Sequence, residues 1–273
     1  MPAGMKDIFT PFVNNMIELN KIYNEDCLIG MQRIPDKSVD MILTDLPYGT
    51  TRNKWDSVIP LEPLWKQYER IIKDDGAIVL TAQAPFDKVL GVSNLKLLRY
   101  EWIWKKTAGT GFLNAKKMPL KDNENILVFG KQDHDHLLVF YKKLPTYNPQ
   151  MRSGFKPYET KKGNHGSNYN QADKETISVS NGERFPVSVL EFPKDTQKSA
   201  LHPTQKPVSL FEYLIKTYTN ENDTVLDSCS GSGTTAVACL NTNRNFICFE
   251  KEKEYHDLSV DRVENHVSQI TLL

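Results

Sequence analysis

The 273-residue chain has few cysteines, and their spacing excludes two common kinds of structure. The four cysteines are Cys27, Cys229, Cys239 and Cys248, and no two of them form a CxxC pair. A structural zinc site and a disulfide framework both need closely spaced or paired cysteines, so we predict neither of them, and no metal site. Such cysteine usage is typical of a reducing cytoplasm, which is the location we expect.

Long apolar runs are also missing from the sequence. No apolar stretch reaches the roughly 20 residues that a helix needs to cross a bilayer. Residues 1–7 lack the basic and then apolar order of a secretion signal. We therefore expect no contact with membranes. The length suits an enzyme with one large core, or a core plus an inserted module.

The chain has no net charge, but its basic and acidic side chains are unevenly distributed. Residues 101–170 contain twelve Lys and Arg against six Asp and Glu, whereas residues 221–264 contain nine acids against four bases. This asymmetry indicates a localised surface that faces phosphate groups. A solvated, lysine-rich insert without a ligand would give the same counts, and charge alone does not separate the two interpretations.

Strand-like and helix-like segments alternate at both ends of the chain. We predict strands at 21–23, 41–44, 77–81, 224–227 and 245–249. Helices are predicted at 61–72, where Asp74-Asp75-Gly76 is expected to close the helix, and from Pro207 onward. This alternation predicts a parallel sheet covered by helices, with ligands at the carboxyl ends of the strands.

The segment Thr44-Asp45-Leu46-Pro47-Tyr48-Gly49-Thr50 directly follows the apolar run 39–43. A strand is therefore expected to end in a carboxylate, a turn stiffened by proline and an aromatic ring. This grouping suits the binding of a flipped nucleobase by its exocyclic amine. Taken alone, an ordinary turn after a strand would look similar.

A second motif lies far along the chain, where a short apolar strand leads into Asp227-Ser228-Cys229-Ser230-Gly231-Ser232-Gly233-Thr234. We predict that a helix follows, from Thr234 to about Leu240. Glycines let the backbone turn sharply and approach a ligand closely. The next strand ends in Glu250, an acid placed to accept the ribose hydroxyls of a nucleoside cofactor. Gly231, Gly233 and Ala236 also satisfy the dinucleotide fingerprint, so this segment alone fits a nicotinamide dinucleotide as well as S-adenosylmethionine. A turn that binds no ligand is a third interpretation.

Four acids would gather at the carboxyl edge of the sheet, because each follows a strand-like run: Asp26, Asp45, Asp227 and Glu250. Any one of them could be a simple turn former. Their coincidence with the glycine loop and Tyr48 favours a functional site. A dehydrogenase has no evident use for the segment 45–48, whereas an amino-methyltransferase needs it.

Together these motifs resemble the DNA amino-methyltransferases, which methylate adenine N6 or cytosine N4 with S-adenosylmethionine. The motif order is similar to that of the beta group, and two further segments match: His202-Pro203-Thr204-Gln205-Lys206-Pro207 and Asn24-Glu25-Asp26-Cys27. The resemblance covers roughly residues 20–105 and 200–260. It implies a Rossmann-like α/β fold with a mostly parallel sheet, a core at 1–105 and 200–273, and a target-recognition insert at 106–199.

The resemblance also implies roles for individual residues. Asp45 and the carbonyl of Leu46 would accept the target amine, Pro47 would stiffen the turn, and Tyr48 would stack on the flipped base. Asp26 and Cys27 would lie near the adenine of the cofactor and Glu250 at its ribose. The methionine part would be surrounded by Asp227, Gly231, Gly233 and Thr234, and its carboxylate held by Thr204, Gln205 and Lys206.

Two positions depart from the family pattern. Leu46 stands where the family usually has proline, which leaves the carbonyl in place but fixes the loop less strongly. Ser228-Cys229 stands where the family usually has Pro-Phe, so an aromatic wall of the cofactor pocket is missing. The expected consequence is either weaker affinity for the cofactor or a substitute ring from elsewhere in the chain.

The middle of the chain interleaves lysine pairs with aromatic residues. Such a segment suits a surface where lysines contact phosphates and other side chains read base edges. We predict DNA-binding roles for Lys116, Lys117, Lys142, Lys143, Lys161 and Lys162. An oligomerisation arm is the alternative for this segment.

Two features of the sequence narrow the choice of target base: the lack of a Pro-Cys pair and the presence of Asp45. No Pro-Cys pair occurs, which disfavours the covalent mechanism of cytosine C5 methylation. Asp45 favours adenine N6, because cytosine N4 enzymes of the family more often carry serine there. We therefore predict site-specific methylation of adenine N6 in double-stranded DNA, by an enzyme that is either an orphan or paired with a cognate restriction nuclease. A homodimer is a candidate assembly, since relatives often pair. The alternatives are cytosine N4 methylation, an RNA amine, a non-catalytic DNA-binding protein and a dinucleotide oxidoreductase.

Overall fold

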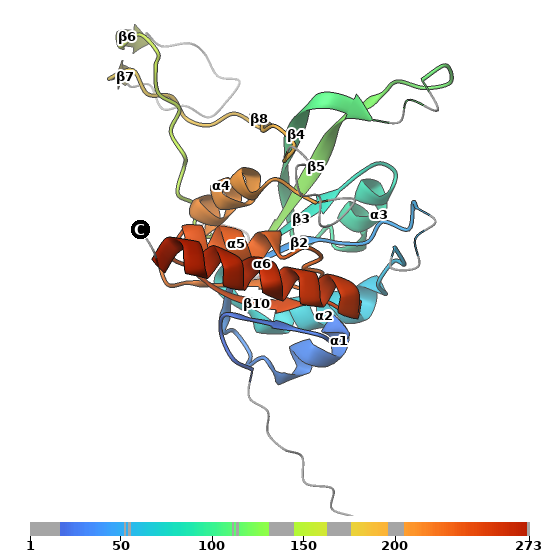
Figure 1. Cartoon of the computed structure of the whole chain (residues 1–273). Coiled ribbons are helices and arrows are strands. Elements are labelled where there is room, and N and C mark those ends of the chain that lie inside the picture. Colours follow the sequence, from blue (N-terminus) through green and yellow to red (C-terminus); the bar gives the residue numbers. More distant parts are fainter. Residues whose placement is uncertain are drawn as a thin grey trace, which may run out of the picture.

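The computed structural model describes residues 17–51, 53, 56–110, 112, 115–130, 145–162, 176–195 and 205–271. Its centre is an eight-stranded sheet with the strand order β1-β10-β9-β2-β3-β5-β4-β8 (Figure 1). The first five strands of that order are mutually parallel. Strand β5 is antiparallel to both β3 and β4, and β8 is parallel to β4. The prediction of a mostly parallel α/β sheet is confirmed.

The strands of this sheet are β1 (Lys21–Tyr23), β2 (Val39–Asp45), β3 (Ile72–Ala82), β4 (Leu98–Thr110), β5 (Lys121–Gly130), β8 (Val189–Glu191), β9 (Thr224–Asp227) and β10 (Asn245–Phe249). The helices are α1 (Cys27–Gly30), α2 (Leu61–Ile71), α3 (Phe86–Ser93), α4 (Val208–Tyr218), α5 (Thr234–Asn241) and α6 (Lys253–Thr271), with a 3-10 turn η1 (Met31–Arg33).

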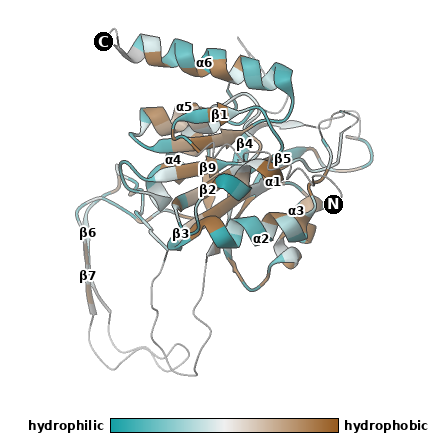
Figure 2. Cartoon of the chain, turned by 90° about the horizontal axis from the view of Figure 1, so that it is seen from below, coloured by the Kyte–Doolittle hydropathy of each residue, from teal (hydrophilic) through white to brown (hydrophobic). Residues whose placement is uncertain are grey.

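Helices cover both faces of the sheet. Figures 1 and 2 show α1, α2 and α3 on one face and α4, α5 and α6 on the other, with hydrophobic strands between them. Successive side chains of β2 point to opposite faces of the sheet. Ile42 packs in the core under α2, whereas Met41 and Leu43 pack in the core under α4. This period of two is what a strand buried on both sides requires.

The predicted end of α2 was wrong by a few residues. The helix ends at Ile71, and β3 begins at Ile72, so the sequence Asp74-Asp75-Gly76 lies within the strand. The register against β2 shifts there, from Val39 opposite Ile72 to Met41 opposite Ala77. A Cβ on Gly76 would lie 2.8 Å from the carbonyl oxygen of Asp40. Glycine is therefore needed for a close strand approach and not for a helix end.

The segment 106–199 contributes to the main sheet and also forms a separate hairpin. Strands β5 and β8 pair with the main sheet, whereas β6 (Tyr158–Lys162) and β7 (Thr176–Ser180) form a two-stranded antiparallel sheet of their own. In Figure 1 this hairpin extends away from the helical layers. The division of the chain at residues 106 and 199 stays a prediction.

Within the described ranges, no helix combines the length and the apolar character needed to cross a membrane. The same residues hold no group of three or more His, Cys, Asp or Glu side chains arranged to bind a metal ion. All four cysteines are free thiols, so no disulfide contributes to the fold.

Candidate active site

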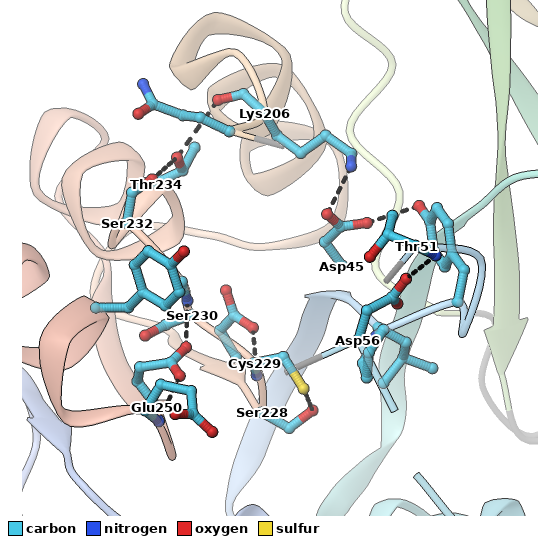
Figure 3. Close-up of a pocket in the computed structure, with 18 of the residues that line it drawn as sticks. Asp45, Thr51, Asp56, Lys206, Ser228, Cys229, Ser230, Ser232, Thr234 and Glu250 are labelled. Atoms are coloured by element: carbon cyan, nitrogen blue, oxygen red, sulfur yellow. Dashed lines mark hydrogen bonds and ion pairs between the residues drawn. The ribbon is translucent and has the colours of Figure 1, made fainter. Parts of the chain in front are cut away.

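A cavity of about 760 Å³ lies at the carboxyl ends of β2, β9 and β10 (Figure 3). The four strand-end acids all line it, as the alternation of strands and helices predicts. Its walls include these residues singled out in the sequence: Asp26, Cys27, Asp45, Leu46, Pro47, Tyr48, Gln205, Lys206, Asp227, Gly231, Thr234 and Glu250. Thr204 lies outside the described residues. The cavity joins the segment 45–48 to the glycine loop, although more than 170 residues separate them in the sequence.

Asp45, the last residue of β2, accepts hydrogen bonds on both carboxylate oxygens. Its Oδ1 accepts from the Tyr48 hydroxyl at 2.7 Å and from the hydroxyl of Thr81 on β3. Its Oδ2 accepts from the Lys206 ammonium at 2.6 Å. The parallel pairing of β2 with β3 sets Asp45 opposite Thr81, which fixes the side of the carboxylate on which that hydroxyl lies. The carboxylate of Asp45, for which the sequence predicts a catalytic role, is thus oriented by three donors.

Tyr48 lies between Asp45 and the apolar residues of α3. Its ring stacks on Phe86, with centroids 5.5 Å apart and ring planes 28° from parallel. Burial, together with the negative charge of Asp45, raises the pKa of the Tyr48 hydroxyl well above its ordinary value, so this hydroxyl stays a donor. Leu46, which replaces the usual proline, is buried in the core under α2. The burial of the Leu46 side chain therefore holds the loop at the position where a proline ring would otherwise restrict the backbone.

Lys206 belongs to a buried group of alternating charges. Its ammonium lies 3.4 Å from Oε2 of Glu124 on β5, and the other oxygen of Glu124 accepts from Lys106 on β4 at 2.5 Å. The side chains of all three residues are less than 10% exposed. Burial lowers the pKa of Lys206, but the carboxylates of Asp45 and Glu124 outweigh that effect and raise it above the ordinary value. Lys206 is therefore charged, and its observed partners are carboxylates of this chain.

The loop after Tyr48 is organised by Asp56. Its carboxylate accepts backbone N–H groups of Gly49 at 2.8 Å, Thr50 at 2.9 Å and Thr51 at 2.6 Å (Figure 3). Burial tends to raise the pKa of Asp56, but these hydrogen bonds outweigh it and hold the pKa below its ordinary value. Sequence reasoning missed this residue, because nothing local distinguishes Asp56 from other loop acids.

The glycine loop between β9 and α5 needs glycine at two positions. Gly231 and Gly233 have φ of 51° and 76°, in the left-handed region that residues with a Cβ rarely adopt. A Cβ on Gly233 would also lie 3.1 Å from that of Ser259 on α6. Asp227 supports the loop from below, accepting the Cys229 N–H at 3.0 Å and the hydroxyl of Thr235. Burial raises the pKa of Asp227 to about 7.

Glu250 and Asp26 also line the cavity, and Figure 3 shows Glu250 on the far side of the pocket from Asp45. Glu250 accepts the backbone N–H groups of Gly231 at 2.8 Å and Glu252 at 2.9 Å, and burial raises its pKa. Asp26 caps α1 by accepting the Leu28 N–H at 2.9 Å. Both acids are therefore fixed by backbone groups, and each still contributes to the cavity wall.

Sequence reasoning also missed a cation at the glycine loop. Arg262 on α6 donates to the Ser232 carbonyl at 3.0 Å and to the Thr234 hydroxyl at 3.3 Å, and it lines the cavity. Burial lowers the pKa of this guanidinium. Gln205, which the sequence motif predicts to hold the cofactor carboxylate, donates its side-chain N–H to Oδ2 of Asp195 at 3.2 Å. The helical pattern of α6 gives no sign that Arg262 faces a site formed by α5.

The predicted DNA-binding lysines are only partly described. Lys116 and Lys117 are exposed in the connection between β4 and β5. Lys142 and Lys143 lie outside the described residues, and only the backbone of Lys161 and Lys162 is described, as part of β6. Their contact with DNA stays a prediction.

The sheet order, the glycine loop and the strand-end carboxylates define a class: nucleoside-cofactor enzymes built on a mostly parallel α/β sheet. The DNA methylase family of the N6/N4 type matches residues 39–261, and the chain belongs to it. The type II methyltransferase M1.MboII of Moraxella bovis is 30% identical over 88% of this chain and 95% of its own length. The DNA adenine methyltransferase YhdJ of Escherichia coli K12 is 26% identical over 90% of this chain and 83% of its own length.

Two solved structures share the fold. The complex of M1.HpyAVI with S-adenosylmethionine is 25% identical, with a TM-score of 0.56 over 89% of this chain and 98% of its own. The cytosine-N4-specific PvuII DNA methyltransferase is 16% identical, with a TM-score of 0.63 over 93% of both chains. The protein is a DNA methyltransferase that depends on S-adenosylmethionine. The cavity fits this cofactor, because the left-handed glycine loop, the strand-end acid Glu250 and the partly buried guanidinium of Arg262 line one continuous space.

Proposed function

We propose that the protein methylates adenine N6 in double-stranded DNA at a specific sequence, by direct attack of a flipped base. The observation that carries this proposal is the position of Asp45. Its carboxylate lines the same cavity as the glycine loop, beside the hydroxyl and ring of Tyr48. A carboxylate and an aromatic ring at the cofactor pocket are the groups that an exocyclic amine on a flipped base needs.

The adenine amine is a poor nucleophile because its lone pair is delocalised into the ring. Asp45 would accept one N–H and the carbonyl of Leu46 the other, which favours a tetrahedral nitrogen. The same acceptors stabilise the positive charge that develops as nitrogen attacks. Pro47 keeps the carbonyl and the carboxylate on one short turn. The proton then leaves nitrogen for water once the new bond has formed.

Tyr48 would stack on the extruded base. Unstacking and unpairing a base costs a few kcal/mol, and an aromatic face offsets part of this cost. The contact with Phe86 fixes the orientation of the Tyr48 ring before a base arrives. The ring is therefore preorganised and does not have to be ordered on binding.

S-adenosylmethionine, when bound, supplies a methyl group on a sulfonium, whose electron pair returns to sulfur on transfer. We assign Glu250 to its ribose, Asp26 and Cys27 to its adenine, and the loop 227–234 to its methionine part. Because Lys206 pairs with Asp45, Arg262 is better placed than Lys206 to meet the methionine carboxylate. Tyr255, which lines the cavity from α6, is a candidate for the ring that Ser228-Cys229 does not provide.

Asp45 supports adenine over cytosine, since serine is more usual at this position in cytosine N4 enzymes of the family. The name of the relative YhdJ, an adenine methyltransferase, agrees with this choice. The basic middle segment supports double-stranded DNA as the substrate, with Lys116 and Lys117 at phosphates. A homodimer and a cognate restriction nuclease complete the proposal, and the type II name of M1.MboII supports the second partner.

Nucleoside mass spectrometry tests this proposal. Unmethylated DNA of varied sequence is incubated with S-adenosylmethionine and either the unmutated protein or the Asp45→Ala variant. We expect N6-methyladenine with the unmutated protein only. N4-methylcytosine would keep the fold and the mechanism but contradict the assignment of the base. The absence of both modified bases, with RNA then methylated, would contradict DNA as the substrate.

A further inference from the structure

Both oxygens of the catalytic carboxylate already accept hydrogen bonds. Oδ1 of Asp45 accepts from two hydroxyls, so its two lone-pair positions are filled. Oδ2 accepts from Lys206 at 2.6 Å, which leaves one position for the target amine. An amine bound there would lie beside an ammonium while positive charge develops on its own nitrogen. Lys206 in this position therefore opposes the reaction that Asp45 supports.

Glu124 has an oxygen available for Lys206. Its Oε1 is held by Lys106 at 2.5 Å, which fixes the carboxylate in place. Its Oε2 is buried without a hydrogen bond and lies 3.4 Å from the Lys206 ammonium. A buried acceptor without a hydrogen bond is uncommon in folded proteins and calls for a reason. A movement of Lys206 toward Oε2 would turn this ion pair into a hydrogen bond and lengthen the contact of the ammonium with Asp45.

We propose that Glu124 is a positioning residue that receives Lys206 when the target amine binds Asp45. The movement leaves the four-charge group of Asp45, Lys206, Glu124 and Lys106 neutral as a whole. It shifts the positive charge toward Glu124 and leaves the negative charge of Asp45 facing the amine. This inference rests on the proposed function and adds a step to it, in which the carboxylate is released by the base that it binds.

The strand that carries Lys106 also provides a matched control. Lys105, the preceding residue of β4, pairs with Glu191 at 2.8 Å. Both of those side chains are more than half exposed, whereas Lys106 and Glu124 are less than 10% exposed. An exposed pair contributes little to stability. Glu191→Gln removes a carboxylate of the same chemistry outside the cavity, so it controls for the loss of charge alone.

A double-mutant cycle tests the proposal. Single-turnover methyl transfer at saturating cofactor is measured for the unmutated protein, Glu124→Gln, Lys206→Met and the double variant. Without the charge of Glu124, Lys206 stays on Asp45, so we expect Glu124→Gln to lower the transfer rate about tenfold. In the Lys206→Met background the same change should alter the rate less than about twofold. Glu191→Gln should transfer methyl groups at the unmutated rate.

Binding of S-adenosylhomocysteine, measured by calorimetry, shows whether each variant keeps its fold. The Kd of Glu124→Gln should stay within about twofold of the unmutated value. Should Glu124→Gln not fold, Glu124→Asp with and without Lys206→Met repeats the cycle, with a smaller loss that must again vanish in the Lys206→Met background.

The outcomes separate the two hypotheses. Equal losses from Glu124→Gln in both backgrounds would overturn the positioning role, since Glu124 would then act independently of Lys206. An undiminished rate in Glu124→Gln would overturn it as well. An unmutated protein that methylates no base would instead refute the proposed function, and the positioning role with it.

Discussion

The cavity has two halves that are held together differently. In the cofactor half, which comprises Asp26, Asp227, Glu250 and the glycine loop, carboxylates accept hydrogen bonds from backbone N–H groups 2 to 19 residues away in sequence. In the target half, which comprises Asp45, Tyr48, Thr81, Glu124 and Lys206, the partners of Asp45 are all side chains, and Lys206 is 161 residues away. The first half is held mainly by backbone groups, with the Thr235 hydroxyl on Asp227 as a side-chain contribution, whereas Asp45 in the other half is held by side chains.

This difference suits the two ligands. A cofactor needs the same pocket in every turnover, and a backbone frame provides it without reorganisation. A flipped base has to displace or share existing hydrogen bonds, and side chains on β2, β3 and β5 permit that exchange. We therefore expect substitutions in the cofactor half to weaken binding of S-adenosylhomocysteine, and substitutions in the target half to lower the transfer rate.

The largest loss of cofactor binding is expected at Gly233. The change Gly233→Val forces a branched side chain into a left-handed conformation beside Ser259, so affinity for S-adenosylhomocysteine should fall about 100-fold or more. Gly154→Ala is the control, because Gly154 also has positive φ but has open space around the Cβ position. Calorimetry on both variants should show a loss at Gly233 only. Equal affinities would place the glycine loop outside the cofactor site.

A smaller loss is expected at Glu250. Gly231 and Glu252 donate to different oxygens of Glu250, so Glu250→Gln keeps an acceptor for one of these backbone N–H groups and sets its own NH2 group against the other. It also removes the charge that would accept two ribose hydroxyls. Affinity for S-adenosylhomocysteine should fall about tenfold, the range of one or two charge-assisted hydrogen bonds. Glu254→Gln, an exposed acid on α6, should bind like the unmutated protein. Unchanged binding in Glu250→Gln would contradict the ribose assignment.

The hydrogen bonds of the Asp56 carboxylate to the loop 49–51 predict that the free energy of unfolding depends on pH. Asp56→Asn should lower the free energy of unfolding by about 1 to 3 kcal/mol at neutral pH, because charged acceptors bind backbone donors more strongly than neutral ones do. The folded-state pKa of Asp56 is lowered, so its contribution is fully present above the unfolded value of about 4 and is lost progressively as the pH falls through the lower folded-state pKa. Urea unfolding of the variant and the unmutated protein at pH 7 and pH 3 measures the loss in free energy of unfolding and its dependence on pH. A difference from the unmutated protein that is as large at pH 3 as at pH 7 would count against this linkage.

The smallest effect is expected on the DNA-facing surface. Reversing the charges of Lys116 and Lys117 to Glu should weaken DNA binding and reduce the slope of log K against log salt by about 2. Lys66→Glu, an exposed lysine on α2, should leave the slope unchanged. Fluorescence anisotropy across a salt series measures the slopes. A slope unaffected by the double reversal would favour the alternative of an oligomerisation arm.

The sequence was informative where contacts are local. The strand, loop and helix from Thr224 to Asn241 could be predicted because apolar residues, glycines and the next strand follow one another within 30 residues. The position of Asp45 could be predicted because it ends an apolar run.

The rest of the target half could not be predicted, because it depends on strand pairing. Glu124 lies opposite Trp104 only through the antiparallel pairing of β4 with β5. Thr81 meets Asp45 only because β3 is parallel to β2. The pattern of residues within one strand does not show which residue of a neighbouring strand lies opposite it. The prediction that Lys206 holds the cofactor carboxylate likewise used a motif that does not show which acid lies within reach of its ammonium.

The most direct test of the division between the two halves is the Asp45→Ala variant, examined for both properties in one sample. Calorimetry gives its Kd for S-adenosylhomocysteine, and single-turnover kinetics gives its rate of methyl transfer to DNA. We predict a Kd within about twofold of the unmutated value and a transfer rate at least about 1,000-fold lower. A parallel loss of both would contradict the division, because Asp45 would then support the cofactor pocket and not the target amine.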